Sequence, residues 1–153
     1  MRTAPARTKG LVIIGATRSD AHVVSVILLA MMLEEAGYEV VNLRCCNPTP
    51  DFFSAIPPDR TAAAIVIANQ NGCALADLQE LPDLLRQHPV PVIVGGHYHV
   101  GCGSTDRVDQ QLYDLGVSCI ATTPEAMFVL LEGLDNGSAP RGAPRRTAQS
   151  VAP

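Results

Sequence analysis

The sequence predicts one α/β domain built on a doubly wound parallel sheet of the flavodoxin-like (Rossmann-like) kind, with five strands in the order 2-1-3-4-5. Its length of 153 residues suits one domain of ordinary size. Five short apolar runs alternate with five helix-like segments, which is the pattern of parallel strands joined by helical crossovers. Such an alternation favours the flavodoxin-like strand order. The expected strands are residues 11–14, 39–43, 63–68, 91–94 and 118–121.

The first expected helix covers residues 23–36. Its apolar residues recur at helical spacing, and Gly37 supplies a stop at the carboxyl-terminal end. Met31 and Met32 belong to this pattern. We therefore expect both methionines to fill the core rather than to form a binding surface.

The other four helices each carry a start or stop signal. Pro82 predicts a bend or break in the third helix, because proline removes a backbone donor. Ser104 or Thr105 is expected to cap the fourth helix, which Gly116 ends. Thr123 is expected to cap the fifth. These four helices are predicted over residues 49–56, 75–87, 104–115 and 124–134.

The composition sets the domain limits and argues against several classes of partner. Residues 1–10 predict a flexible amino terminus, residues 11–135 the folded domain, and residues 136–153, rich in Ala, Pro, Arg, Gly and Ser, a disordered tail. A net charge of −4 offers no basic field for nucleic acid. Five cysteines without a CxxC pair predict reduced thiols. We expect a cytoplasmic protein that contacts neither membrane nor nucleic acid.

The loops after the first, third and fourth strands, residues 15–22, 69–74 and 95–103, should meet at the carboxyl edge of the sheet, where such folds bind ligands. The first loop holds Asp20 and His22, two residues apart. An Asp that binds one ring nitrogen of a His leaves the other free to ligate a metal. The alternative is that Asp20 caps the following helix beside a solvated histidine.

Familiar sites of this architecture do not fit the chain. The first loop lacks the GxGxxG of a dinucleotide site, the acidic residues and lysine of a receiver domain are absent, and few aromatic residues are present to stack on a flavin. A small zinc site built from His97, His99 and Cys102 is a further alternative, since these side chains are borderline-soft ligands.

With the loops placed, the chain resembles the small (sigma), cobalamin-binding subunit of glutamate mutase (methylaspartate mutase), and more broadly cobalamin-binding domains of the base-off/His-on type. The resemblance spans residues 11–131. It rests on a DxHxx(G) signature and on segments that match the second strand, a glycine-rich loop and the entrance to the last helix. These segments are Asp20-Ala21-His22-Val23-Val24-Ser25 preceded by Ser19, residues 36–43, Val94-Gly95-Gly96 with Val100-Gly101, and residues 122–125.

The resemblance implies that His22 displaces the dimethylbenzimidazole of the cofactor and ligates cobalt from the lower face. Asp20 would then accept a hydrogen bond from the other ring nitrogen. The displaced nucleotide tail would insert between the first helix and the loops after strands three and four, where Gly95 and Gly96 leave room. The implied cofactor-binding residues are Ser19, Asp20, Ala21, His22, Val23, Ser25, Ala68, Asn69, Gln70, Gly95, Gly96, His97, Tyr98, His99 and Thr123.

Two departures from the family pattern concern the nucleotide tail. Ser25 stands where the signature has glycine, and so adds a side chain where the tail should pass. The SxL motif of the family corresponds to Ala68-Asn69-Gln70, in which Ala68 cannot donate a hydrogen bond. Asn69 or Gln70 would have to substitute, since each carries a donor and an acceptor.

By the same resemblance, the chain is expected to be the cobalamin-carrying subunit of an adenosylcobalamin-dependent carbon-skeleton mutase, an isomerase inactive on its own. A separate, barrel-type large subunit would bind substrate, and no catalytic residue beyond the axial pair is expected in this chain. The alternative is a non-catalytic cobalamin-binding sensor or methyl-carrier module with altered cofactor binding.

Overall fold

The computed structural model describes residues 8–101 and 104–135. Its sheet has five parallel strands in the order β2-β1-β3-β4-β5, which confirms the predicted doubly wound fold. Each strand lies within two residues of its expected bounds. The strands are β1 (Leu11–Ala16), β2 (Glu39–Asn42), β3 (Ala62–Ala68), β4 (Val92–Gly95) and β5 (Cys119–Ala121).

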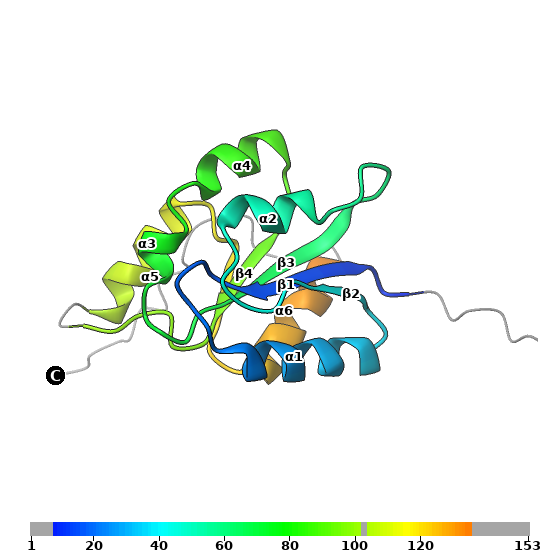
Figure 1. Cartoon of the computed structure of the whole chain (residues 1–153), viewed down its shortest axis with the longest axis horizontal. Helices are drawn as coiled ribbons and strands as arrows, with labels where there is room; N and C mark the ends of the chain where they lie inside the picture. The colour runs from blue at the N-terminus through cyan, green and yellow to red at the C-terminus, as the bar shows by residue number, and fades with distance from the viewer. Residues whose placement is uncertain (1–7, 102–103, 136–153) are drawn as a thin grey trace, which may run out of the picture.

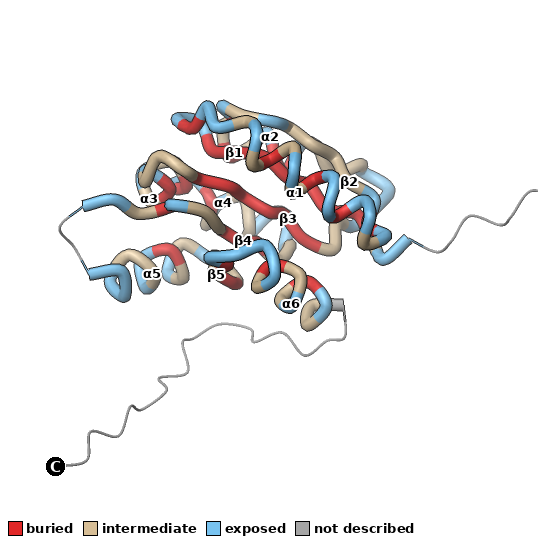
Figure 2. Tube along the Cα trace, turned by 90° about the horizontal axis from the view of Figure 1, so that it is seen from below, coloured by how far each residue is buried: buried red, intermediate tan, exposed pale blue. Residues whose placement is uncertain are grey.

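Helices cover both faces of the sheet (Figure 1). Helices α1 and α6 pack on one face, and the remaining helices pack on the other. Figure 2 shows the central strands β1, β3 and β4 as the most buried part of the molecule, between these helical layers, whereas the edge strand β2 is less buried. The helices are α1 (Val23–Glu35), α2 (Thr49–Ser54), α3 (Ala74–Asp77), α4 (Leu81–Gln87), α5 (Thr105–Asp114) and α6 (Pro124–Asp135).

Two apolar cores follow from the alternation of side chains along each strand. In β1, Val12 and Ile14 face α1 and α6, whereas Leu11 and Ile13 face the opposite layer. All four side chains are almost fully buried. This burial on both faces explains why the strands read as continuous apolar runs.

The predicted third helix is broken, but not at the proline itself. It forms two short helices, α3 and α4, separated at residues 78–80. Pro82 lies in the first turn of α4, where a missing N–H removes no helical bond. Thr123 caps α6, because its Oγ1 accepts the Ala126 N–H at 3.2 Å. Ser104 occupies the N-cap position of α5 without a side-chain capping bond.

Met31 and Met32 do not fill the core, contrary to the expectation. Their side chains are exposed, whereas the buried face of α1 consists of Val26, Ala30 and Leu33. The reason is that α1 is apolar almost all round. Helical spacing alone therefore did not distinguish the core face from the outer face.

The ends of the chain lie largely outside the described residues, including all of the predicted tail and most of the predicted flexible amino terminus. Just before β1, Lys9 N donates to Gly37 O and Glu39 N donates to Gly10 O. None of the described helices combines the length and apolar character needed to cross a bilayer.

Candidate functional site

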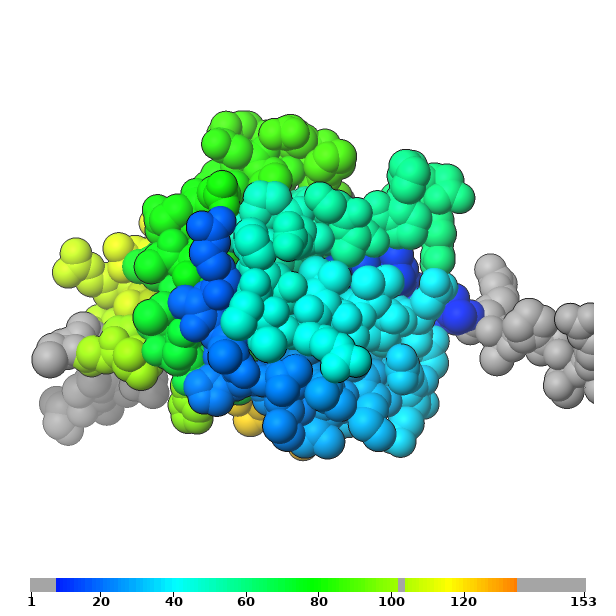
Figure 3. Space-filling model, in the orientation of Figure 1, coloured from blue at the N-terminus to red at the C-terminus, as the bar shows by residue number. Residues whose placement is uncertain are grey.

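The loops that follow β1 and β3 meet at the carboxyl edge of the sheet. Figure 3 shows the blue segment after β1 at the surface, against the green segment after β3. Ser19 Oγ donates to Asp77 Oδ2 at 2.6 Å, and Asn71 Nδ2 donates to Ser19 O at 2.9 Å. These bonds fix the loop that carries Asp20 and His22.

His22 and Asp20 form the pair expected from the sequence. Nδ1 of His22 lies 2.6 Å from Oδ1 of Asp20, and the same oxygen accepts the backbone N–H of His22 at 3.1 Å. A carboxylate only accepts, so Nδ1 donates in this bond, and in the neutral ring the free lone pair then lies on Nε2. The His22 side chain is 63% exposed and that of Asp20 is 0% exposed. The ring is thus held from the protein side, with a free nitrogen available outside.

Asp20 is locked into the loop by further bonds. Gln70 N donates to Oδ2 at 2.6 Å, and Cys46 N donates to Asp20 O at 3.0 Å. Desolvation, followed by a hydrogen bond with Cys45, raises the pKa of the Cys46 thiol, which therefore stays protonated beside Asp20. The carboxylate bonds His22 and Gln70 rather than the first turn of α1, and the N-cap position belongs to His22. Asp20 is not a helix cap.

An open hollow surrounds the exposed face of His22. It lies between the start of α1 and the loops after β3 and β4, and His97 stands on its other side. Apart from Gln70 and the two histidines, its lining is small or apolar. The lining residues are Ala21, His22, Val23, Val24, Ser25, Gln70 and His97.

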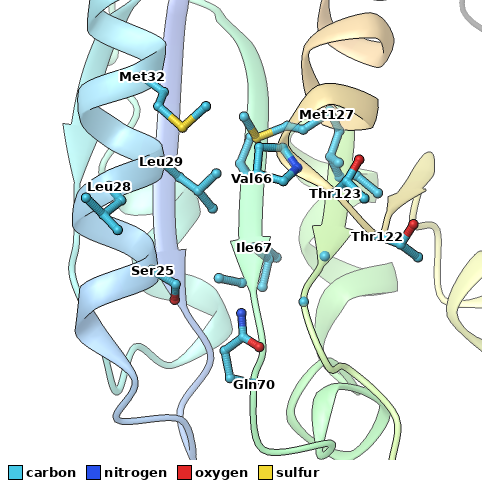
Figure 4. Close-up of a pocket in the computed structure, with 16 residues that line it drawn as sticks. Ser25, Leu28, Leu29, Met32, Val66, Ile67, Gln70, Thr122, Thr123 and Met127 are labelled. Atoms are coloured by element: carbon cyan, nitrogen blue, oxygen red, sulfur yellow. The ribbon is translucent and has the colours of Figure 1, made fainter.

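A second cavity, of about 280 Å³, lies between α1 and α6 over the carboxyl halves of β3, β4 and β5. Figure 4 shows Leu29 and Met32 reaching into it from α1, and Met127 from α6. The central strands leave this space because Ala68 and Gly95 end them with little or no side chain. Thr123 and Gly96 also line the cavity.

Gln70 and Ser25 line both spaces, so they form the wall between them. The Gln70 backbone holds Asp20, as described above, and its Oε1 accepts the His97 N–H at 3.2 Å. The Ser25 hydroxyl donates to His22 O at 3.3 Å. One side of this wall faces the histidine, and the other faces the apolar cavity.

Five predicted site residues line neither space: Ser19 and Asp20, which support His22 from behind, and Asn69, Tyr98 and His99. Asn69 is fully buried and holds its own loop: Nδ2 donates to Thr17 Oγ1 at 2.7 Å, and Oδ1 accepts the Gly72 N–H at 2.9 Å. Tyr98 packs into the core on the opposite face of the sheet. His99 forms a β-bridge with Cys73 and lines neither space.

Tyr98 departs most from its expected place beside the cofactor. Its hydroxyl donates to Asp109 Oδ1 at 2.7 Å, and burial, followed by this bond, raises its pKa. A large ring placed one residue after an exposed histidine turns inward because the opposite core can bury it. Tyr98 therefore anchors the loop after β4 to α5.

Most of the helix side chains that wall the cavity were not predicted from the sequence. Leu28, Met32 and Met127 were not among the expected site residues, although Leu28 and Met32 lie one helical turn apart. The sequence signal that could have indicated Leu28 and Met32 is the apolar helix that directly follows the loop carrying His22. Asp77, which fixes Ser19, carried no recognisable pattern.

The alternative zinc site receives no support from the part of the chain that the structure describes. Cys102, one of its three expected ligands, lies outside the described residues. Within the described residues, no three His, Cys, Asp or Glu side chains are grouped as metal ligands.

Comparison with known proteins gives a consistent set of relatives, although no family model matches the chain. Glutamate mutase sigma subunit 1 of Haloarcula marismortui is 31% identical over 125 residues, which are 78% of this chain and 82% of that protein. The sigma subunit of Halobacterium salinarum is 33% identical, over 71% of this chain and 74% of its own length. That of Treponema denticola is 31% identical, with 68% and 76% covered.

Solved structures share the fold. A chain of the methanol:cobalamin methyltransferase complex from Methanosarcina barkeri superposes with a TM-score of 0.70 and 20% identity, over 92% of this chain. A cobalamin-binding protein from Desulfitobacterium hafniense gives a TM-score of 0.65 and 17% identity, over 82% of this chain. The chain spans 52% and 58% of those two chains.

Proposed function

Because the chain belongs to the glutamate mutase sigma subunit family, we propose that it is the cobalamin-binding small subunit of an adenosylcobalamin-dependent carbon-skeleton mutase. The observation that carries this proposal is the pairing of a buried Asp20 with an exposed His22 beside an apolar cavity. A carboxylate behind an imidazole fixes its tautomer and makes it a better ligand.

The residues present fit a base-off/His-on cobalamin. Nε2 of His22 is an exposed imidazole nitrogen with its lone pair free, which is the donor that the lower face of cobalt requires. The cavity, at about 280 Å³, is close to the lower limit of ~300 Å³ for ligand pockets. It therefore suits the nucleotide tail, while the larger corrin would lie over the open hollow around His22.

In this arrangement the chain's own residues bind and orient. His22 would hold the cofactor, Asp20 would keep the imidazole proton on Nδ1, and His97, which lines the same hollow, would contact it as well. Leu29 and Met127 would enclose the tail in apolar surroundings. Adenosylcobalamin, when bound, supplies radical chemistry.

We propose that a separate, barrel-type large subunit binds the substrate and covers the upper face. The hollow around His22 is open, and the described residues form one domain around a single sheet, which leaves the outer side of the hollow uncovered. Activity then requires both chains. The sequence expectation of a cytoplasmic location belongs to the same proposal.

The second candidate is a sensor or methyl-carrier module with weakened binding. Asn69 favours it, because its amide is fully used inside the loop and offers nothing to the tail. Full activity of the chain with a glutamate mutase large subunit would exclude this candidate. Methyl transfer from methylcobalamin to an acceptor would support it.

A titration with adenosylcobalamin, followed by its visible spectrum, tests the proposed function. The wild type should bind base-off with histidine coordinated, and His22→Ala should lose that spectrum. His97→Ala is the matched control, since His97 borders the same hollow but makes no bond to Asp20. Equal spectra for His22→Ala and wild type would reject His22 as the ligand.

A further inference from the structure

The side-chain amide of Gln70 has a fixed orientation. Its Oε1 accepts the backbone N–H of His97 at 3.2 Å, and only the oxygen end of an amide can accept that bond. Nε2 must therefore be the other end, which Figure 4 shows directed into the cavity. Within the described part of the chain, this Nε2 donates no hydrogen bond.

The Gly96 backbone also confines the side-chain amide of Gln70. A Cβ placed on Gly96, whose φ is +95°, would lie 2.9 Å from Nε2 and 3.0 Å from Cδ, so the bare Gly96 backbone packs directly on the amide. The Gln70 backbone, from which the side chain starts, is fixed separately, because its N–H donates to Asp20 Oδ2. The donor is thus fixed before any ligand arrives, which lowers the entropy that binding would cost.

Apolar side chains surround the cavity beyond this donor. Leu29, Met32 and Met127 suit the faces of an aromatic ring, but a ring nitrogen buried among them needs a hydrogen-bond donor. The Ser25 hydroxyl already donates to His22 O. Thr122 points away from the centre of the cavity (Figure 4).

We propose that Gln70 Nε2 donates a hydrogen bond to a ring nitrogen in the base of the nucleotide tail. The site then selects cobamides whose lower base is an aza-heteroaromatic, such as a benzimidazole, over cobamides with a phenolic base. This selectivity deepens the proposed function and rests on it, because it names the class of cofactor that the same cavity takes.

The test measures dissociation constants of wild type and Gln70→Met for three probes: cobalamin, p-cresolylcobamide, whose base has no ring nitrogen, and cobinamide, which has no nucleotide tail. Methionine keeps the length of the side chain and leaves the backbone bond to Asp20 in place. Comparing variant with wild type for each probe cancels the probes' intrinsic differences in base coordination. Circular dichroism and thermal melting check that the variant folds.

The expected result is a loss for cobalamin that is about fivefold greater than the loss for p-cresolylcobamide, with cobinamide unchanged. Equal losses for both cobamides would place the amide on the ribose or phosphate and overturn base selection. An equal loss for cobinamide too would show an effect through Asp20 and His22 instead. No loss for any probe would also overturn the inference. The proposed function fails separately, when the wild type binds no cobamide or binds cobalamin as His22→Ala does.

Discussion

Replacing Asp20 with Asn tests the support behind the metal ligand with almost no change in shape. The Asp20 carboxylate is inaccessible to solvent and accepts three hydrogen bonds, from His22 Nδ1, His22 N and Gln70 N. Asparagine has one oxygen and one NH₂ group. With its oxygen toward His22, its NH₂ would face the Gln70 N–H, donor against donor. With its NH₂ toward His22, the ring proton would move to Nε2 and block ligation.

The cost follows from these contacts. A hydrogen bond to a charged group contributes about 1.5–3 kcal/mol, and an unpaired buried donor costs a further ~1–3 kcal/mol. Because the backbone relaxes in part, we expect the free energy of unfolding of Asp20→Asn to fall by about 2–4 kcal/mol. Loss of the partner behind a metal-ligating histidine should weaken cobalamin binding by about 10–100-fold.

Urea unfolding of the cofactor-free protein and the cobalamin titration measure the two effects. Asp77→Asn is the control, since Asp77 also fixes this loop through Ser19 but does not touch His22. Its binding should stay near that of the wild type. If Asp20→Asn unfolded and bound cobalamin like the wild type, the account of Asp20 as the support of His22 would be wrong.

Three other substitutions probe the walls and the loop after β4. Ser25→Gly removes the side chain between the hollow and the cavity, and should strengthen cobalamin binding in the same titration; weaker binding would mean that the serine contacts the tail. Gly96→Ala places a Cβ 2.5 Å from Asn69 O at a φ of +95°, and should lower the melting temperature and weaken binding. Tyr98→Phe removes the bond to Asp109, and should cost about 1 kcal/mol without changing cobalamin binding. Burial raises the Tyr98 pKa, so above about pH 10 the folded state binds more protons than the unfolded state, and the free energy of unfolding falls as pH rises. Tyr98→Phe should lose less of its free energy of unfolding over this range. Equal pH profiles for the variant and the wild type would contradict this.

Strand and helix positions could be predicted because both kinds of element carry strong local signals. Strands buried on both faces form continuous apolar runs, and Gly37 and Gly116 take the positive φ expected of helix stops. The side of α1 that faces the core could not be predicted, because the apolar residues surround the helix. Only the position of the sheet decides that Leu33 is buried and that Met31 is exposed.

At the site, the sequence identified the pair and the loop residues that line the two spaces, but not the helix side chains around the cavity or the bonds that hold the pair. Asp20 and His22 are two residues apart, so local geometry brings them together. Gln70 meets Asp20 across 50 residues through its backbone, which no side-chain pattern encodes. Tyr98 was predicted to line the cofactor site but packs into the core on the opposite face of the sheet. The direction of a loop side chain depends on which core has room for it, and the sequence does not show this.

The central claim, that His22 ligates cobalt, is tested most directly by electron paramagnetic resonance of the protein loaded with cob(II)alamin. The unpaired electron couples to the axial nitrogen, and only the protein is labelled when it is produced with ¹⁵N-histidine. The account predicts that the nitrogen triplet seen with unlabelled protein becomes a doublet in the labelled protein, and that His22→Ala removes this change while His97→Ala keeps it. A triplet that persists in the labelled wild type would show that the benzimidazole stays on cobalt, and would contradict the account.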